Sequence, residues 1–417
     1  MRVAVVGGGI VGLACAHALA ERGMEVVLLE GASSLGDGAS RGNTGWIVPS
    51  LSMPLAAPGT LAAGVRAALN PRGALVIRPA LDTSWLRWLW QFRRSCSAEN
   101  FRRGVSALLE LNRLTFQQLD AYRADGIEFE SHSTGVLVVA LQEKGLAWFS
   151  MLFDELVRAG FDGVLRPLDG TQARELEPAL SDAVACALHT STDRHVQPQS
   201  LMAGLALRLE RDGVLISTEA EVVSLAPKGR GWQLRTQLAG TVEADRVVVA
   251  AGAATRALLA PLGIRLPLVG AKGYSVDLVG SGRTPRTALY LSEPKIGASP
   301  FDDGLRIAGV FELPGRSVSV SRRRIEQIVA DTVPYMSSWR PAGGELQGQG
   351  WAGLRPATPD GLPLLGAVPD LPGLIVATGH GMLGVTLAPA TAVVVADMLE
   401  TGITPSWVEA FRPTRRI

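Results

Sequence analysis

A glycine-rich turn near the start of the chain constrains the fold more than any other feature of the sequence. Gly7, Gly9 and Gly12 follow the apolar run 3–6 and precede a stretch of small residues that predicts a helix. Gly7 permits a tight turn, Gly9 lets the backbone approach a pyrophosphate, and Gly12 lets the helix pack closely on the strand. The pattern therefore predicts a strand–turn–helix unit of the Rossmann type.

The end of the next strand completes this unit. The apolar run 26–29 predicts a second strand, and Glu30 closes it where a carboxylate can accept hydrogen bonds from an adenosine ribose. The helix between the strands directs its N-terminal N–H groups and positive dipole end toward the phosphates. An isolated glycine turn is a weak signal. Here strand, turn, helix, second strand and acidic end occur in order, so we predict a bound dinucleotide.

The same segment also resembles a secretory signal. A basic Arg2 and an apolar stretch precede the small residues 16–20. However, three glycines interrupt the apolar region, and the predicted helix continues into Glu21 and Arg22 before the second strand. Cleavage there would divide a coherent folding unit, so we favour the folded interpretation.

Length and charge narrow the class of protein. A chain of 417 residues is longer than one hydrophobic core usually supports, so two domains are expected. Hydrophobic residues make up 47% and charged residues 19%, which supplies a large core. The net charge of +1 gives no overall attraction to nucleic acid, and we predict no nucleic-acid partner.

Cysteine usage and apolar runs indicate the compartment. Cys15, Cys96 and Cys186 are far apart and have no metal-ligand spacing, so we predict no metal site, no disulfide framework and a reducing environment. No apolar run reaches the roughly 18 residues of a membrane helix, and the longest, 385–399, contains a proline and an aspartate. The sequence predicts a cytoplasmic protein and leaves an association with the inner face of the membrane open.

Hydrophobic periodicity alternates between helix and strand along most of the chain. Helices are predicted at 85–122, 144–159, about 197–212 and from 384 to about 398. Strands are predicted at 135–140, 214–217, 221–225, 232–236, 241–243, 246–250, 272–278, 287–292, 305–311 and 374–378.

A second glycine-rich loop distinguishes between dinucleotides. Gly379, Gly381 and Gly384 lie between the strand 374–378 and an apolar helix. A helix N-terminus aimed at an isoalloxazine ring stabilises the negative charge that develops there on reduction. We therefore predict FAD, with an NAD-dependent dehydrogenase as a remote alternative. A simple strand-to-helix turn without a ligand is the structural alternative for this loop.

Several segments resemble the D-amino acid oxidase-like flavoproteins, and within them the bacterial D-amino acid dehydrogenases. The resemblance runs nearly end to end. It rests on the segments 5–12 with Glu30, 39–45, 56–59, 78–79, 85–90, 272–275, 351–356, 360–361 and 378–381. The segments 272–275, 351–356 and 378–381 are the specific ones, because the opening loop is shared by many nucleotide-binding proteins.

The resemblance implies a non-covalent FAD site. No cysteine lies near Arg355 or His380, which argues against a covalent thioether to the flavin. The implied FAD-binding residues are Gly7, Gly9, Ile10, Val11, Gly12, Glu30, Ser40, Asn43, Thr44, Gly45, Val222, Gly252, Gly379, Gly381, Met382, Leu383 and Gly384.

The resemblance also implies three catalytic residues. Arg355 is expected to hold a substrate carboxylate, since a guanidinium fork matches it and stays charged. Tyr274 could add a hydroxyl hydrogen bond to that carboxylate, and His380 could polarise the flavin ring or line the pocket. The structural alternatives are an ion pair between Arg355 and Asp360, a packed strand tyrosine and a packed loop histidine.

The chain returns to a strand–glycine–helix pattern at its far end, which predicts a discontinuous domain. We expect an α/β plus α+β fold, with a Rossmann-like FAD-binding domain and a smaller β-sheet-rich substrate domain. The expected FAD-binding segments are 1–80, 166–264 and 346–417, and the expected substrate segments are 81–165 and 265–345.

The resemblance implies an enzyme that oxidatively deaminates D-amino acids. Hydride transfer from the α carbon to flavin N5 would give an imino acid and then a keto acid. Thr44 and the segment 193–198 depart from the pattern of close relatives, which leaves the substrate open. The alternatives are an oxidase or dehydrogenase for glycine, secondary amines, D-proline or hydroxy-D-proline, and a non-catalytic flavoprotein subunit.

A further segment bears on which electron acceptor the protein uses. A dehydrogenase of this kind passes electrons to a quinone or carrier. The segment 85–94 mixes aromatic and cationic residues, as a helix in peripheral contact with a membrane does. A core-packing helix is the alternative.

Overall fold

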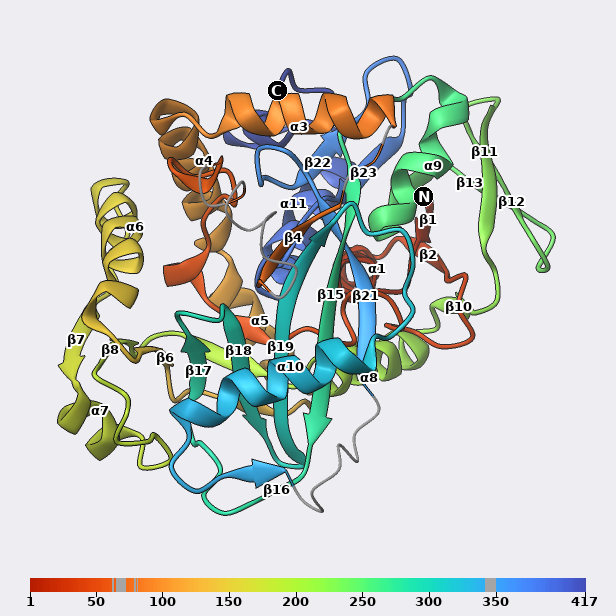
Figure 1. Cartoon of the computed structure of the whole chain (residues 1–417). Coiled ribbons are helices and arrows are strands. Elements are labelled where there is room, and N and C mark those ends of the chain that lie inside the picture. Colours follow the sequence, from red (N-terminus) through yellow and green to blue (C-terminus); the bar gives the residue numbers. More distant parts are fainter. Residues whose placement is uncertain (62–63, 65–72, 79, 81, 342–349) are drawn as a thin grey trace.

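The protein folds around two large β-sheets (Figure 1). The computed structural model describes residues 1–61, 64, 73–78, 80, 82–341 and 350–417. Pro79, part of one resemblance segment, lies outside these residues.

The first sheet contains both predicted dinucleotide strands. Its order is β10-β2-β1-β14-β23-β22, in which the first five strands are parallel and β22 is antiparallel. The strands are β1 (Arg2–Val6), β2 (Glu25–Leu29), β10 (Leu215–Ser217), β14 (Arg246–Val249), β22 (Leu364–Ala367) and β23 (Leu374–Thr378). Because β1 lies between β2 and β14, the chain reverses its strand order at the carboxyl end of β1, where such sheets bind ligands.

Alternating side chains of this sheet bury two different cores. One face packs on helices, and Val3, Val5 and Leu28 belong to this core. The helices are α1 (Ile10–Glu21), α4 (Ala98–Asn112), α5 (Thr115–Ala124), α8 (Pro198–Arg211) and α11 (Gly384–Thr401). The opposite face packs on β11 (Val222–Lys228), β12 (Gly231–Thr236), β13 (Thr241–Ala244) and α9 (Thr255–Leu259).

The helix α11 is long and apolar enough to cross a membrane, judged by its length and composition only. It is the one helix of the described chain of which this is true, and 67% of it is buried inside the protein. It packs in the same core as α1. Its apolar character is therefore that of a core helix.

The second sheet carries the β-rich segments. Its order is β21-β15-β19-β18-β17-β6-β8-β7, with β4 paired to β19. The strands are β4 (Leu75–Ile77), β6 (Val136–Ala140), β7 (Leu165–Asp169), β8 (Cys186–Thr190), β15 (Val269–Leu278), β17 (Ala288–Leu291), β18 (Ile296–Phe301), β19 (Gly304–Leu313) and β21 (Trp351–Ala357). The helix α10 (Arg322–Thr332) crosses one face of this sheet (Figure 1).

Further elements lie outside the two large sheets. They are β3 (Trp46–Ile47), β5 (Ser131–His132), β9 (Arg194–Val196), β16 (Gly280–Ser281), β20 (Arg340–Pro341), α3 (Thr83–Ser95), α6 (Ala147–Arg158) and α7 (Gly170–Leu176). β3 and β5 both pair with β9, which anchors the end of the long loop that follows β2.

The predicted helical stretch 85–122 is helical in the structure but is not one helix. The structure divides it into α3, α4 and α5. Ser97 begins α4 by accepting a hydrogen bond from the N–H of Asn100, which is the usual function of an N-cap serine. Because the three helices have similar apolar spacing, periodicity alone did not reveal the breaks.

Three stretches of the chain pack with the domain other than the one expected for them from the sequence. β7 and β8 pair in the second sheet, β21 does so too, and α4 and α5 pack on α1 and α11. We propose that 98–124 belongs to the Rossmann-like domain, whereas 165–190 and 351–357 belong to the substrate domain. The expected boundaries at 80/81 and 345/346 involve residues outside the described chain.

Candidate functional site

A cavity of about 690 Å³ opens at the carboxyl ends of the parallel strands. This volume is in the range of about 300–1,000 Å³ typical of ligand pockets. Eleven of the predicted cofactor residues line it. They are Gly7, Gly9, Ile10, Val11, Glu30, Ser40, Asn43, Val222, Gly252, Gly381 and Gly384.

The glycine turn leaves no room for side chains. Gly7 has φ +107°, and a Cβ there would lie 2.6 Å from the carbonyl oxygen of Ala250. A Cβ at Gly12 would lie 1.8 Å from the carbonyl oxygen of Gly7, so α1 can approach β1 only because this residue is glycine. Gly12 therefore allows the close packing of α1 on β1, although it does not line the cavity.

The N-terminus of α1 is suited to an anion. The N–H of Ile10 donates to Oγ of Ser40 at 3.1 Å. The next N–H groups, those of Val11 and Gly12, have no acceptor among the residues that the structure describes. Unpaired N–H groups at the positive end of a helix dipole attract a phosphate.

Glu30 lies beside this helix end. Its carboxylate accepts hydrogen bonds from the N–H of Gly8 at 2.5 Å and of Ala32 at 2.8 Å. These two bonds orient the carboxylate and leave lone pairs on both oxygens for further donors, such as ribose hydroxyls. The residues present thus fit the adenosine end of FAD.

Five more predicted cofactor residues do not line the cavity. A Cβ at Gly45 would lie 1.8 Å from the carbonyl oxygen of Val196, and a Cβ at Gly379 would lie 2.9 Å from Cγ2 of Thr358. Both glycines have positive φ, so they set the course of their loops. Of the other three, Met382 is 51% exposed, Leu383 is the N-cap of α11, and Thr44 is in the loop before β3.

Sequence reasoning missed much of the cavity wall. The missed residues are mostly small and apolar, and they follow strands or lie on short helices. They are Val6, Leu29, Gly31, Gly38, Ala39, Glu221, Val223, Ala250, Ala251, Ala254, Ala257, Leu258, Pro356, Ala377, Thr378 and Val385. An alanine carries no chemical signal, and only the strand predictions pointed to this edge of the sheet.

Arg355 lies on β21 in the second sheet. β21 pairs with β15 so that Arg355 is opposite Ala271 and its guanidinium covers Gly273, where a Cβ would lie 1.7 Å from Nη1. Nη1 donates to the carbonyl oxygen of Val310 at 3.1 Å. Burial lowers the pKa of Arg355 to about 10, so the group remains a cation at neutral pH.

No carboxylate of the described chain forms an ion pair with Arg355. The predicted alternative, a pair with Asp360, is wrong because Asp360 is bound by Arg415, from Nε at 2.7 Å and from Nη2 at 2.8 Å. Arg355 is thus a partly buried cation without a carboxylate partner in the described chain, as expected of a residue that binds an anionic ligand.

A strained residue supports the arginine. Val310 has φ +66°, in the left-handed region that disfavours a β-branched residue. It lies where the register of β15 and β19 shifts, between the pairs Lys272–Glu312 and Tyr274–Gly309. Such bulges occur near functional sites, where they redirect backbone groups. Here the carbonyl that the bulge redirects is the one that accepts from Arg355.

Tyr274 does not lie beside Arg355. In the continuous register of β15 and β21, Tyr274 is opposite Ala352, three positions along β15 from the partner of Arg355, so the two side chains leave opposite faces. Its ring is 2% exposed and packs in the core beneath α10. The structure therefore favours the strand-packing alternative for Tyr274.

His380 contributes to the cavity lining, but its ring points into the protein. Nε2 lies 3.0 Å from Oγ1 of Thr391 on α11. Burial lowers the pKa of His380 to about 4, so the imidazole is neutral at pH 7. The structure favours an anchoring role, in which His380 ties the glycine loop to α11.

The glycine loop and the strand of Arg355 are directly joined. The N–H of Gly381 donates to the carbonyl oxygen of Pro356 at 2.9 Å, and Ala357 forms a β-bridge with His380. The predicted flavin loop and the predicted carboxylate-binding strand therefore meet at one place.

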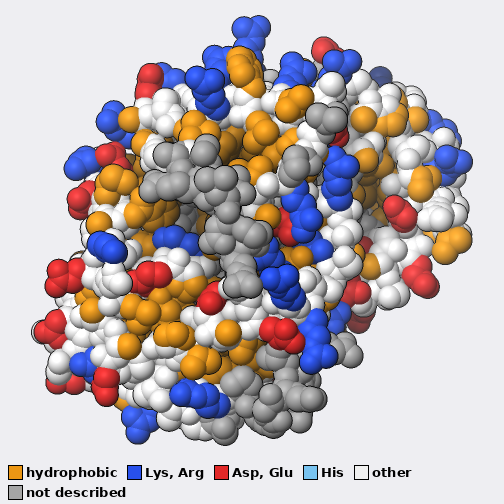
Figure 2. Space-filling view, viewed as in Figure 1, with side chains coloured by type: hydrophobic (Ala, Val, Ile, Leu, Met, Phe, Trp, Pro, Cys, Tyr) orange, Lys and Arg blue, Asp and Glu red, His pale blue; other side chains and the backbone are white. Residues whose placement is uncertain are grey.

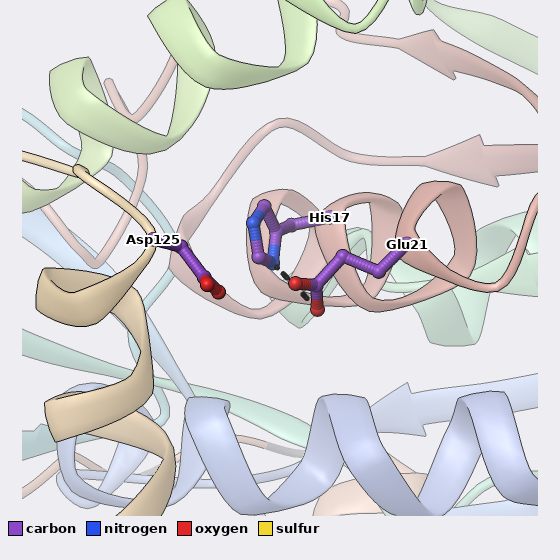
Figure 3. Close-up of side chains that lie close together, drawn as sticks. All are labelled: His17, Glu21 and Asp125. Carbon is purple, nitrogen blue, oxygen red and sulfur yellow. Dashed lines mark ion pairs between the residues drawn. The ribbon is translucent and has the colours of Figure 1, made fainter.

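Two groups of histidine and acidic side chains lie apart from this cavity. In one, Nδ1 of His17 is 3.4 Å from Oε2 of Glu21, and Asp125 faces the same carboxylate (Figure 3). Arg208 donates to the backbone carbonyl of Asp125 at 2.9 Å and supplies positive charge there. The other group is Glu130, His132 and Asp302. Neither group shares a residue with the cavity lining.

The fold and the cavity define a dinucleotide-binding protein of the Rossmann-like class, in which the second sheet contributes Pro356 of β21 to the cavity wall, while its neighbour Arg355 does not line the cavity. A sequence model of the family described as FAD dependent oxidoreductase (DAO) matches residues 2–398. The chain belongs to this family and is an FAD-dependent oxidoreductase. The predictions of the family and of FAD are confirmed, and the NAD alternative is wrong.

Named relatives extend over almost the whole chain. The chain is 33% identical over 414 residues to a D-amino acid dehydrogenase of Xylella fastidiosa (strain M12), covering 96% of this chain and 92% of the relative. It is 32% identical over 406 residues to a D-amino acid dehydrogenase of Cereibacter sphaeroides, with the same coverage.

Solved structures share the fold. Glycine oxidase from Geobacillus kaustophilus superposes with a TM-score of 0.75 at 25% identity, over 100% of this chain and 99% of the other. L-proline dehydrogenase from P. horikoshii superposes with a TM-score of 0.71 at 19% identity, over 99% and 97%. The predicted two-part fold is thereby confirmed.

Proposed function

We propose that the protein oxidises D-amino acids to imino acids, which hydrolyse to keto acids. The observation that carries this proposal is Arg355, a cation without a carboxylate partner among the described residues, on a strand that contacts the glycine loop before α11. The names of the dehydrogenase relatives support the substrate class.

The two glycine loops are proposed to hold opposite ends of FAD. The N–H groups at the start of α1 would bind the pyrophosphate, and Glu30 would bind the adenosine ribose. Gly381 and Gly384, at the start of α11, would face the flavin. Bound FAD supplies a ring that accepts two electrons and a proton as hydride.

The residues of this chain supply orientation. Arg355 would bind the substrate carboxylate through its guanidinium fork, and this contact fixes the direction of the Cα–H bond. Burial makes His380 a weak base and its ring points into the protein, so we expect the substrate amine to lose its extra proton to solvent before reaction. Placement, more than proton transfer by a side chain, is the expected contribution to the rate.

An anaerobic titration of the purified holoprotein tests the proposal. The flavin absorption near 450 nm should bleach with D-amino acids and remain with their L-enantiomers. A panel that includes glycine, secondary amines, D-proline and hydroxy-D-proline separates the alternative substrates. Retention of the band with every amino and imino acid tested would favour a non-catalytic flavoprotein subunit.

The helix α3 supports the proposed acceptor and location. Leu86 and Trp90 are 53% and 54% exposed, and the guanidinium of Arg94 lies 4.8 Å from the Trp90 ring centre. Trp85 and Trp88 are buried on the other side. Figure 2 shows basic and apolar side chains together along the edge where α3 runs in Figure 1.

We infer that α3 contacts the inner face of the membrane in a cytoplasmic protein and brings it to a quinone or carrier. Trp90→Ser should reduce co-sedimentation with anionic vesicles, because the exposed ring would enter the lipid interface. Leu207→Ser, at a residue 54% exposed on another helix, is the control. Equal sedimentation of both variants and the wild type would contradict the membrane contact.

A further inference from the structure

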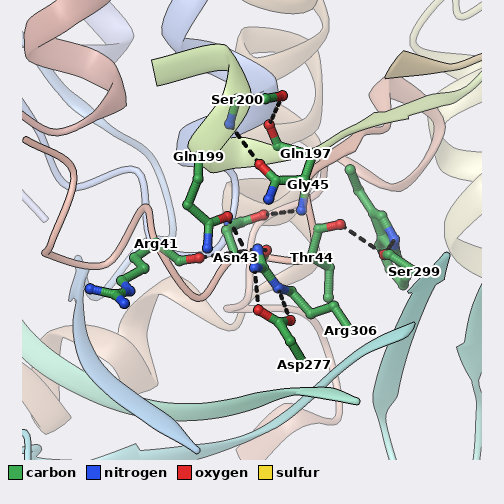
Figure 4. Close-up of polar contacts among 11 residues, drawn as sticks. Arg41, Asn43, Thr44, Gly45, Gln197, Gln199, Ser200, Asp277, Ser299 and Arg306 are labelled. Atoms are coloured by element: carbon green, nitrogen blue, oxygen red, sulfur yellow. Dashed lines mark hydrogen bonds and ion pairs between the residues drawn. The ribbon is translucent and has the colours of Figure 1, made fainter. Parts of the chain in front are cut away.

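The loop between Ser40 and Gly45 lies between the two domains. Ser40 and Asn43 line the cavity, while three of the loop's backbone carbonyls accept hydrogen bonds from the second sheet. The carbonyl oxygen of Thr44 accepts a hydrogen bond from Oγ of Ser299 at 2.7 Å. The carbonyls of Arg41 and Asn43 both accept from Arg306 on β19 (Figure 4).

Arg306 uses all five of its N–H groups. Nη1 donates to Arg41 at 3.0 Å and to Asn43 at 2.9 Å. Nε and Nη2 donate to the two carboxylate oxygens of Asp277 at 2.6 and 2.7 Å, and Nη2 also donates to Oε1 of Gln199 at 3.0 Å. A planar guanidinium can satisfy these five acceptors at once, whereas a lysine ammonium cannot.

The hydrogen bonds from Arg306 leave the loop 40–45 little conformational freedom. A Cβ at Gly42 would lie 2.0 Å from the ring of Trp351, so the loop lies directly on β21. The carbonyls of Arg41, Asn43 and Thr44 accept from the second sheet, whereas that of Gly45 accepts from Val196 on β9. Asn43, which lines the cavity, donates from Nδ2 to the carbonyl oxygen of Met382 at 3.3 Å, so the loop also contacts the glycine loop before α11.

We propose that Arg306 is a positioning residue for FAD, which fixes the loop 40–45 in the conformation that binds the cofactor. The proposal rests on the proposed placement of FAD in the cavity. Arg306 touches no part of the cavity itself, so it acts through the backbone of Arg41 and Asn43.

The ion pair between Arg306 and Asp277 does not by itself explain the five hydrogen bonds of Arg306. Arg306 is 2% exposed, but Asp277 is 55% exposed and borders a second cavity of about 310 Å³. A hydrated carboxylate gains little from a partner. The loop carbonyls, by contrast, lose their donor if the guanidinium is removed, and leaving a partly buried acceptor unpaired costs free energy.

The chain contains a matched control. Arg415 also binds a carboxylate with two nitrogens, that of Asp360, and donates to the carbonyls of Leu362 and Pro363. Its side chain is 10% exposed. It ties the C-terminal segment to the loop after β21, and none of these acceptors lines the cavity.

The experiment compares FAD affinity in Arg306→Met, Arg306→Lys and Arg415→Met. Each full-length protein is stripped of FAD and titrated with FAD, with flavin fluorescence as the signal, and the thermal unfolding of each stripped protein is recorded. Arg306→Met should weaken FAD binding by about tenfold to hundredfold, the equivalent of one or two hydrogen bonds, and Arg306→Lys by less. Arg415→Met should lower the unfolding temperature with FAD affinity within about twofold of the wild type.

A double variant separates loop positioning from charge pairing. If Arg306 only neutralises Asp277, then adding Asp277→Asn to Arg306→Met should restore FAD affinity. If Arg306 positions the loop, affinity should stay low.

Restored affinity, or an unchanged dissociation constant in Arg306→Met, would overturn the inference while the proposed function stands. If Arg306→Met does not fold, Arg306→Lys gives the same comparison. Failure of the wild type to bind FAD would overturn the proposed function and this inference with it.

Discussion

At the scale of the residue, Arg355 is the side chain on which the proposed chemistry depends. Replacing it with alanine removes the fork that would bind the substrate carboxylate, and two charge-assisted hydrogen bonds are worth at least about 3 kcal/mol together. We expect kcat/KM to fall at least about a hundredfold while FAD remains bound. Steady-state kinetics with a D-amino acid, together with the flavin spectrum, measure both. Unchanged kcat/KM would contradict the assignment of Arg355.

Tyr274 provides a paired test, since its hydroxyl was predicted to share the role of Arg355. Its side chain leaves the opposite face of β15 and packs beneath α10. Tyr274→Phe should therefore change kcat/KM by less than about threefold, because the hydroxyl that it removes lies on the face of the sheet opposite to Arg355. A loss comparable to that of Arg355→Ala would support the original sequence prediction.

The sequence was sufficient to predict residues whose type alone indicates their role. It was not sufficient where the role of a residue depends on its position in the fold. Gly7, Glu30 and Ser40 were found because turns, ribose contacts and loops need particular residues, and all three line the cavity. The role of Tyr274 depends on strand register, and a change of one position moves a side chain to the other face. Arg306 was missed because a single arginine in a strand gives no signal until its five acceptors are located.

At the scale of the element, the contact between α1 and β1 determines whether the first glycine turn can form. Gly12→Ala would bring a Cβ to 1.8 Å from the carbonyl oxygen of Gly7, so the helix must move away from the strand. We expect loss of FAD binding and a lower unfolding temperature. The free energy of unfolding should fall by about 1–3 kcal/mol, which is typical of overpacking. Flavin content after purification and thermal unfolding measure the two effects.

Gly38→Ala is the control for this prediction. Gly38 lines the same cavity, but its backbone φ is not positive and no atom lies within 4 Å of the position of a Cβ. This variant should keep its FAD and its unfolding temperature. If Gly12→Ala behaved like Gly38→Ala, close packing of α1 on β1 would not be a condition for the site.

Strands with clear periodicity were predictable, whereas two strands that contain both glycine and proline were not. The predicted strands 272–278, 305–311 and 374–378 correspond to β15, β19 and β23. β18 and β21 were missed, since β18 contains Gly297 and Pro300 and β21 contains Gly353 and Pro356. Such residues lower strand propensity, and the sheet tolerates them because neighbouring strands supply the remaining hydrogen bonds.

At the scale of the whole molecule, the proposed site exists only where the two domains meet. The cavity belongs to the first sheet, Arg355 to the second, and the hydrogen bond from Gly381 to Pro356 joins them. Segments from both halves of the chain form each sheet, so contacts distant in sequence determine the domains. Local patterns could predict that the domain is discontinuous, but not that α4 and α5 pack with α1.

Three buried histidines make the stability of the whole molecule depend on pH. Burial lowers the pKa of His17, His195 and His380 to about 4 each. An unfolded chain holds protons on histidine below about pH 6.5, whereas the folded chain does not until about pH 4. The unfolded state therefore binds more protons in this window, and the stability that these groups contribute above pH 6.5 is lost as the pH falls.

Asp193 acts in the opposite direction. Burial raises its pKa to about 6, so below that pH the folded state holds a proton that the unfolded state lacks until near pH 4. The three histidines outweigh Asp193 and Glu21, whose pKa burial also raises, and each uncompensated proton costs about 1.4 kcal/mol per pH unit. We expect the unfolding temperature of the holoprotein to fall between pH 6.5 and pH 4.5. His17→Phe, at a ring 1% exposed whose nitrogens form no hydrogen bond, should make the fall less steep, and an equal slope would contradict the role of buried histidine.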